Sequence, residues 1–171
     1  NMHHLGTLQD LFVYELRDLH SAEQQLVQAL PKMAQAASST DLRDAFNMHL
    51  EQTRNHVQRL DQIFSKLGAN PGSEECEAMK GLIKEGEGVI KSQGDSAVKD
   101  AALISAAQRV EHYEIAGYGT VRTFAKELGY DDAVDLLDKT LEEEGNTNKK
   151  LTKLAEGSVF NTGINERATA D

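Results

Sequence analysis

Apolar side chains recur every three or four residues along almost the whole chain, which is the spacing of one face of an α-helix. The chain has only two prolines, Pro31 and Pro71, and no run of alternating apolar and polar residues long enough to predict a strand. A glycine or a short polar turn follows each periodic segment, as expected where a helix ends. The pattern therefore predicts five helices, over residues 7–37, 41–67, 73–92, 96–128 and 131–156.

The lengths of the connections predict how these helices pack. Short turns separate the first helix from the second and the fourth from the fifth, so each pair should form an antiparallel hairpin. Between the hairpins lies a crossover of about 30 residues that contains the short helix 73–92. This is the connectivity of an all-α, ferritin-like antiparallel four-helix bundle. We expect one domain over 1–171, with the bundle at about 7–156 and a loose C-terminal tail, or partner-docking arm, at 157–171.

Several polar side chains fall on or beside the apolar stripes of the long helices. At about 100° per residue, Glu114 lies at the centre of the stripe of helix 96–128, and Glu111 lies one turn earlier on the same side. Most of these residues are near the midpoints of their helices, which antiparallel packing brings to one level. The sequence thus predicts a polar layer in the core, with these candidates: Asp18, His49, His56, Glu111, Glu114 and Glu144.

Buried carboxylates need a partner, because an ionised and unpaired carboxylate in a core costs several kcal/mol. They can pair with cations, become protonated or bind a metal ion. The lysines and arginines of these helices occupy surface or flank positions, which favours a metal. A set rich in oxygen with few histidines suits Fe, Mn or Mg, and carboxylates can bridge two ions. We therefore predict an Fe or Mn site that could be dinuclear. The alternative is a set of half-exposed flank residues that bind nothing.

Composition argues against several classes of partner. The chain has 171 residues, with 28 Asp and Glu against 18 Lys and Arg, and a formal net charge of -10. No nucleic acid partner is expected, because phosphate binding needs a basic surface. No membrane partner is expected either, because no apolar run approaches the roughly 20 residues of a membrane span. The lone cysteine, Cys76, fits a reducing compartment, so we expect a cytoplasmic protein.

The sequence around the candidate residues resembles a known family. The similarity extends over about 8–156 and is to the YciF/YciE family, in four stretches: 16–26, 49–53, 111–120 and 141–144. The resemblance implies a ferritin-like fold distantly similar to rubrerythrin, a homodimer and a role in bacterial stress responses. Its similarity to rubrerythrin-type sites also supports Glu111-x-x-Glu114 as a pair of metal ligands.

The chain departs from the rubrerythrin-type pattern at two places. Helix 131–156 offers Glu144-x-x-Thr147 where such sites usually carry Glu-x-x-His, and Gln52 stands where a second glutamate is often found. A weak, mononuclear or lost site therefore remains an alternative. We expect either a metal-dependent protein that reduces peroxide or dioxygen, or a metal-free dimeric interaction or scaffold protein induced by stress. Tyr113 and Tyr118 flank the predicted site, as packing aromatics or as hydrogen-bond donors to a ligand.

Overall fold

The structure is a computed structural model that describes residues 3–170. Residues 1, 2 and 171, which the expected single domain includes, lie outside the described residues. The part of the chain from 3 to 170 forms six helices and no strand: α1 (Leu8–Ala36), α2 (Thr40–Leu67), α3 (Glu77–Lys91), α4 (Ser96–Glu127), α5 (Asp131–Glu156) and α6 (Ile164–Arg167). None of the described helices is long and apolar enough to cross a membrane.

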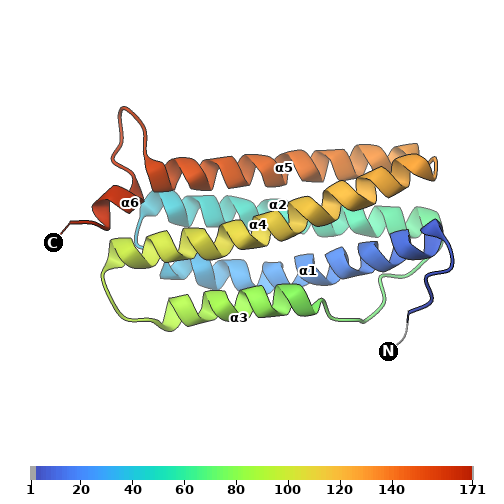
Figure 1. The fold of residues 1–171 in the computed structure, drawn as a ribbon, viewed down its shortest axis with the longest axis horizontal. Helices are drawn as coiled ribbons and strands as arrows, with labels where there is room; N and C mark the ends of the chain where they lie inside the picture. The colour runs from blue at the N-terminus through green and yellow to red at the C-terminus, as the bar shows by residue number, and fades with distance from the viewer. Residues whose placement is uncertain (1–2, 171) are drawn as a thin grey trace.

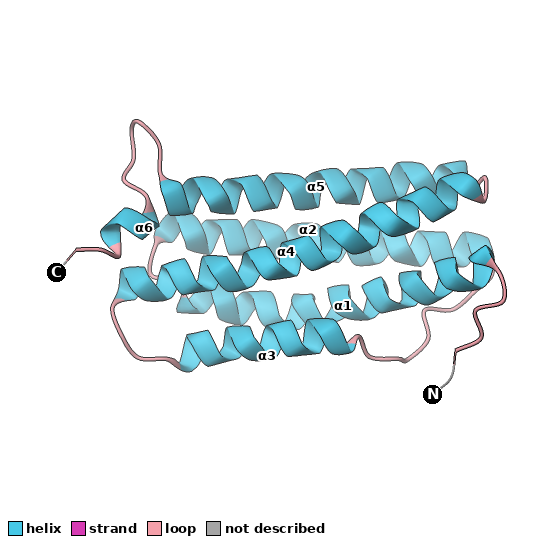
Figure 2. Cartoon of the chain, viewed as in Figure 1, coloured by secondary structure: helices cyan, strands magenta, loops and turns pink. Residues whose placement is uncertain are grey.

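The four long helices pack side by side as two antiparallel hairpins, α1 with α2 and α4 with α5 (Figure 1). The crossover between the hairpins carries α3, which packs on the outside of the bundle against α1 and α4. Figure 2 shows that the bundle is helical almost throughout, with loops mainly at its ends. The predicted ferritin-like bundle, with its long crossover and short fifth helix, is therefore confirmed.

Local chemistry explains where the long helices begin and end. The Thr7 hydroxyl accepts a hydrogen bond from the Asp10 amide, and the Asp10 carboxylate accepts one from the Thr7 amide, a capping box that starts α1. Gly68 ends α2 with φ at 66°, a left-handed conformation that strains any side chain. Gly129, with φ at 78°, allows the tight turn between α4 and α5. These signals keep the turns short and therefore the neighbouring helices antiparallel.

The C-terminal segment differs from the loose tail expected at 157–171. Gly157 and Thr162 form an antiparallel bridge, and α6 then packs against α4 and α5. Ile164 of α6 is buried and joins the apolar core. A Cβ on Gly157 would lie 2.4 Å from the backbone nitrogen of Gly163, so both glycines are needed for this close approach. One buried isoleucine and a glycine contact hold the segment, and neither produces a helical periodicity in the sequence.

The apolar core is divided into two clusters along the bundle. One cluster includes Leu30 and Leu42 and fills the end where α6 packs. The other includes Leu16 and Phe64 and fills the opposite end. Around the boundary between the two clusters, each of the four long helices carries a buried acid or histidine. The predicted polar layer therefore lies across the middle of the bundle.

The helices α1 and α4 approach each other closely at Gly117. A Cβ at this position would lie 2.7 Å from Cδ2 of Leu19, too close for any side chain without a shift of Leu19. The missing side chain lets the two helices come together just beside the polar layer. Acids on α1 can therefore meet acids on α4.

Candidate metal centre

Six buried side chains meet in the polar layer between the two apolar clusters. They form two groups, and within each group one possible ligand atom per residue lies within 4.8 Å of the others. We call the first group the His56 position and the second the His49 position. The groups are Glu23, His56, Glu114 and Glu144, and His49, Glu111 and Glu144. Because Glu144 belongs to both, the two positions are adjacent parts of one cluster.

Helix spacing explains why these side chains converge. Glu111 and Glu114 lie one turn apart on α4, and His49 and His56 lie two turns apart on α2, so each pair projects from one side of its helix. Single glutamates from α1 and α5 complete the cluster. All six residues are 0–2% exposed, which makes them a fully buried polar set.

Each histidine lies among carboxylates. The Nδ1 atom of His56 is 2.8 Å from Oε2 of Glu23 and 2.9 Å from Oε1 of Glu144. The Nε2 atom of His49 is 2.9 Å from Oε1 of Glu111 and 3.9 Å from Oε1 of Glu144. At both positions, an imidazole nitrogen and several carboxylate oxygens share one small space, as the ligands of a metal ion do.

Most polar atoms of the cluster make no hydrogen bond of good geometry, although His49 Nε2 and His56 Nδ1 each lie 2.9 Å from a carboxylate oxygen. Both carboxylate oxygens of Glu111, Glu114 and Glu144 are buried without one, as are Oε1 of Glu23 and both ring nitrogens of His49. Native cores rarely leave polar atoms unpaired, because each such atom costs about 1–3 kcal/mol. A metal ion would satisfy these atoms together, and carboxylate oxygen with imidazole nitrogen suits Fe or Mn. The donor set therefore fits a metal ion.

Burial and mutual contact also shift the ionisation of the cluster. Burial would lower the pKa of His56, but Glu144 and Glu23 outweigh it and raise this pKa to about 10. Burial would likewise lower the pKa of His49, yet Glu111 and Glu144 raise it well above its usual value. Burial raises the pKa of Glu111, although His49 opposes that shift. The cluster thus holds protons at its ligand atoms, and a metal ion would have to displace them.

Tyr118 contacts the cluster directly. Its hydroxyl donates a hydrogen bond to Oε2 of Glu23 at 3.0 Å, and its ring meets His56 edge-on, with centroids 6.2 Å apart. The side chain is completely buried. Of the two roles expected for this tyrosine, the structure shows both, since Tyr118 packs in the core and donates to a candidate ligand.

Five of the six residues predicted from the sequence lie in the cluster, and Asp18 does not. Asp18 is half-buried on the outer side of α1, where Oδ2 accepts a hydrogen bond from the Tyr113 hydroxyl at 2.5 Å. The same hydroxyl lies 3.3 Å from Sγ of Cys76. Asp18 directly precedes Leu19, which faces the core, and one residue of an α-helix turns the side chain by about 100°. Asp18 is therefore not among the candidate ligands that the structure brings together.

Glu23 is the member of the cluster that sequence reasoning missed. The buried stripe of α1 runs through Leu16, Leu19 and Leu26, and Glu23 fills the place between the last two at the same spacing. The sequence prediction placed Asp18 on the inner face, but the first half of this face follows Leu16 and Leu19, about one residue away. The spacing of the large leucines was the signal that could have found it.

The two departures from the rubrerythrin-type pattern lie beside the cluster. The Thr147 hydroxyl donates a hydrogen bond to Oε1 of Gln52 at 3.1 Å, and both side chains are half-buried. Neither residue belongs to the two groups. Both imidazoles come from α2, as His49 and His56. The departures thus change which helix supplies nitrogen donors without removing those donors from the cluster.

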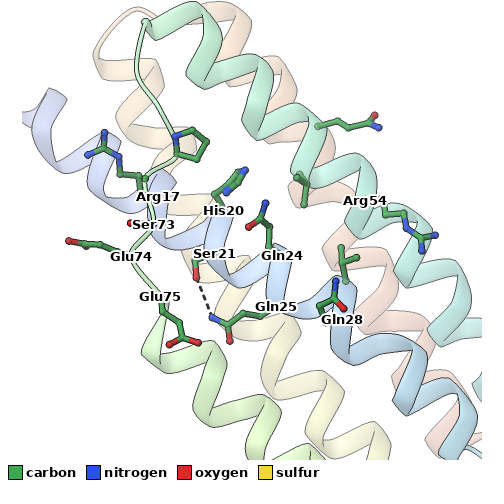
Figure 3. A pocket seen from close by; sticks show the side chains of 15 residues that line it. Arg17, His20, Ser21, Gln24, Gln25, Gln28, Arg54, Ser73, Glu74 and Glu75 are labelled. Carbon is green, nitrogen blue, oxygen red and sulfur yellow. Dashed lines mark hydrogen bonds between the residues drawn. The ribbon is translucent and has the colours of Figure 1, made fainter.

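An open groove of about 930 Å³ lies outside the bundle, between α1, α2 and the segment 71–75. Figure 3 shows its polar lining, with Arg17 and Arg54 at its sides and a hydrogen bond between Ser21 and Gln25. None of the six cluster residues is among those that line it. The groove and the buried cluster are therefore separate features.

The connectivity of the bundle and the glutamates and histidines at its centre define the class of protein: a ferritin-like protein whose core contains a candidate metal centre. Within this class, the chain belongs to the family described as "Domain of unknown function (DUF892)", whose model matches residues 7–168.

Relatives of known structure agree with this assignment. Protein YciF of Escherichia coli (strain K12) is 49% identical over 156 residues, which are 91% of this chain and 94% of that protein. The crystal structure of the E. coli stress protein YciF matches with a TM-score of 0.85 and 48% identity, over 88% of this chain and 95% of that chain. YcfI from Rhodopseudomonas palustris matches with a TM-score of 0.84 and 47% identity, over 87% of this chain and 95% of that chain. The resemblance inferred from the sequence is confirmed.

A more distant likeness concerns the fold alone. A dodecameric thioferritin from Bacteroides fragilis matches with a TM-score of 0.65 at 18% identity, over 86% of this chain and 84% of that chain. The likeness supports the ferritin-like arrangement of the helices.

Proposed function

We propose that this chain is a bacterial stress protein whose core binds two Fe or Mn ions and reduces peroxide or dioxygen. The observation that carries the proposal is the buried cluster of glutamates and histidines whose donor atoms lack hydrogen-bond partners. The similarity to YciF, which is called a stress protein, supports the biological part of the proposal.

In this proposal, the His56 position and the His49 position each hold one ion. Glu144 belongs to both groups, so it would serve as a ligand at each position. When bound, two divalent ions would supply the two electrons that reduce hydrogen peroxide to water or dioxygen to peroxide, and an external small-molecule or protein reductant would have to return them for a second turnover.

The chain's own residues would prepare the site for this chemistry. The six residues of the cluster are 0–2% exposed, so a substrate larger than peroxide or dioxygen would not reach ions held by them. The Tyr118 hydroxyl holds a proton at hydrogen-bond distance from Glu23. This hydrogen bond would orient Glu23 at the site, while burial and the nearby carboxylates raise the pKa of Tyr118 and keep its hydroxyl protonated.

The first test is the metal content of the untagged protein, purified without added metal or chelator and measured by mass spectrometry. The proposal expects about two Fe or Mn ions per chain. Glu114→Ala should lower this content, whereas Glu127→Ala, which changes an exposed acid on the same helix, should not. The metal-loaded protein should also consume hydrogen peroxide, and Glu114→Ala should consume it more slowly. A protein that takes up no metal on reconstitution would refute the proposal.

The second candidate function is a metal-free scaffold induced by stress. One observation favours it: His49 Nε2 lies 2.9 Å from Glu111 and His56 Nδ1 lies 2.8 Å from Glu23, so two imidazolium ions would balance buried carboxylates without any metal. In that case chelator should leave the thermal stability unchanged and peroxide should not be consumed. The metal measurement above separates the two candidates.

We also propose that the chain forms a homodimer and acts in the cytoplasm. The dimer is the state that the YciF/YciE resemblance implies, and the lone buried thiol of Cys76 fits a reducing compartment. Light scattering during size-exclusion chromatography should give twice the chain mass. A single-chain mass across the accessible concentration range would refute the dimer.

A further inference from the structure

The two positions of the cluster differ in what stands behind their histidines. At the His56 position, the Nε2 atom, on the side of the ring away from the other ligands, is 3.2 Å from Oε1 of Glu143. At the His49 position, the ring nitrogen Nδ1 is buried and has no hydrogen-bond partner. One imidazole is therefore held from outside the cluster, and the other is not.

Glu143 is itself held by an arginine of another helix. Arg59 on α2 faces both oxygens of Glu143 on α5, with Nη1 2.5 Å from Oε1 and Nη2 3.3 Å from Oε2. The same Nη1 donates to the Thr140 hydroxyl at 3.1 Å. The side chains of Arg59 and Glu143 are 11% and 22% exposed, so the pair is largely shielded from water. A planar guanidinium across a carboxylate fixes the direction of that carboxylate.

A fixed carboxylate next to an imidazole decides which ring nitrogen carries the proton. A neutral imidazole has one N–H donor and one lone-pair acceptor. If Nε2 donates to Glu143, the lone pair is on Nδ1, which lies between Glu23 and Glu144. Outer partners of this kind orient metal-bound histidines, and their removal typically weakens metal binding by about 10- to 100-fold.

We propose that Glu143, fixed by Arg59, is a positioning residue that presents Nδ1 of His56 to a metal ion, so that the His56 position fills before the His49 position. This inference rests on the proposed function, because it requires that the cluster binds metal. The centre would then hold one ion tightly, at the His56 position, and exchange the other more readily. The His56 position also has four potential ligands against three at the His49 position, which favours the same order.

The test is a calorimetric titration of the metal-free protein with Mn²⁺. The wild type should bind in two distinguishable steps. Glu143→Ala should weaken the first step by about 10- to 100-fold and leave the second nearly unchanged. Glu142→Ala is the matched control, since Glu142 is the exposed neighbour on the same helix and contributes to neither group. Two equal steps in the wild type, or a Glu143→Ala variant that behaves like Glu142→Ala, would overturn the inference.

A second readout separates positioning from general stability. Nitrogen NMR of histidine-labelled protein loaded with Zn²⁺ should show His56 bound through Nδ1 with its proton on Nε2. This tautomer should be lost or mixed in Glu143→Ala. A merely structural Glu143 would lower the thermal stability but would leave the tautomer and the first binding step in place, which would refute positioning. If Glu143→Ala does not fold, Glu143→Gln keeps an acceptor oxygen without the charge and should show a smaller change in the same direction.

The outcomes also distinguish this inference from the proposed function. A wild-type protein that binds no metal refutes the proposed function and the inference with it. A wild-type protein that binds two ions without any dependence on Glu143 refutes the inference alone.

Discussion

Two polar clusters lie on different sides of one turn of α4, and they differ in how their polar atoms are satisfied. Glu114 faces the core and both of its carboxylate oxygens lack hydrogen-bond partners. Its neighbour Tyr113 faces α1 and α3, where its hydroxyl donates to Asp18 and lies near the thiol of Cys76. In the second cluster each side chain has a partner within the protein, so nothing further is needed to satisfy it. Mid-helix position is therefore a weaker guide to a metal ligand than the absence of a partner.

Burial strengthens this contrast. The residues of the metal cluster are 0–2% exposed, whereas Asp18 and Tyr113 are half-buried. Water can reach the edge of the second cluster and lowers the cost of its charge there. Water does not reach the metal cluster, so either protons or a metal ion must neutralise its carboxylates. The predictions below test this difference between the two clusters.

The largest effect is expected from the residue that both metal positions share. Glu144→Ala should abolish nearly all metal binding, because it removes a ligand from each position at once. Mass spectrometry should show a fall from about two ions per chain to almost none. Glu142→Ala, an exposed acid two residues away, should keep the wild-type content. Equal metal contents in the two variants would contradict the assignment of Glu144.

Metal removal should affect stability through the inner cluster alone. An ion that binds the folded state stabilises it by about 2.7 kcal/mol when its free concentration is 100-fold above the dissociation constant. Chelation should therefore lower the melting temperature of the wild type and leave that of Glu144→Ala unchanged. Thermal unfolding with and without Mn²⁺ measures the difference. A similar chelator effect on both proteins would show that the metal binds elsewhere.

Loss of the Asp18 carboxylate, in the second cluster, should lower the free energy of unfolding without changing the metal content. Asp18→Ala leaves the Tyr113 hydroxyl without its acceptor, which should cost about 1–2 kcal/mol of unfolding free energy. Urea denaturation of the metal-free protein measures this cost, and mass spectrometry of the loaded variant measures the metal. If Asp18→Ala loses metal to the extent that Glu114→Ala does, Asp18 is a ligand after all and the contrast between the clusters fails.

The smallest effect concerns the thiol of Cys76, which belongs to the second cluster together with Tyr113 and Asp18. Burial raises the pKa of Cys76, although its hydrogen bond with Tyr113 opposes that shift. A raised pKa means less thiolate at a given pH, so alkylation of the folded protein should be slow near neutrality and should accelerate as the pH rises. The alkylation rate of the folded protein, compared with that of the urea-unfolded chain, measures the effect. Equal rates in the two states at neutral pH would contradict the burial of this thiol.

Much of the fold is predictable because it depends on patterns within single helices. Periodic apolar residues mark the long helices, and glycines such as Gly68 and Gly129 mark where they end. The long crossover then distinguishes the ferritin-like connectivity from a simple up-and-down bundle. The segment after Gly157 was predicted less well, because its contacts with the bundle are made by a few residues in irregular backbone.

The candidate site divides in the same way. The pairs Glu111 with Glu114 and His49 with His56 follow from the spacing of one helix, as does the inward direction of Glu144. An error of one residue in the stripe of α1 was enough to exchange Glu23 for Asp18, because each residue turns the helix by about 100°. The spacing of apolar residues in one helix thus predicts where along the bundle the site lies more reliably than it predicts which residues form the site.

The amino-acid sequence by itself determined the helices, their connectivity and the level at which acids and histidines enter the core, since each of these follows from short-range periodicity and loop length. Only the tertiary structure decided which polar atoms meet. It brought Glu23 to the ligands, gave Asp18 a partner outside them and set Glu143 behind His56. The physical reason is that hydrogen bonding and metal binding depend on distances of a few ångströms between different helices. Those distances are set by the rotation and packing of all four helices together.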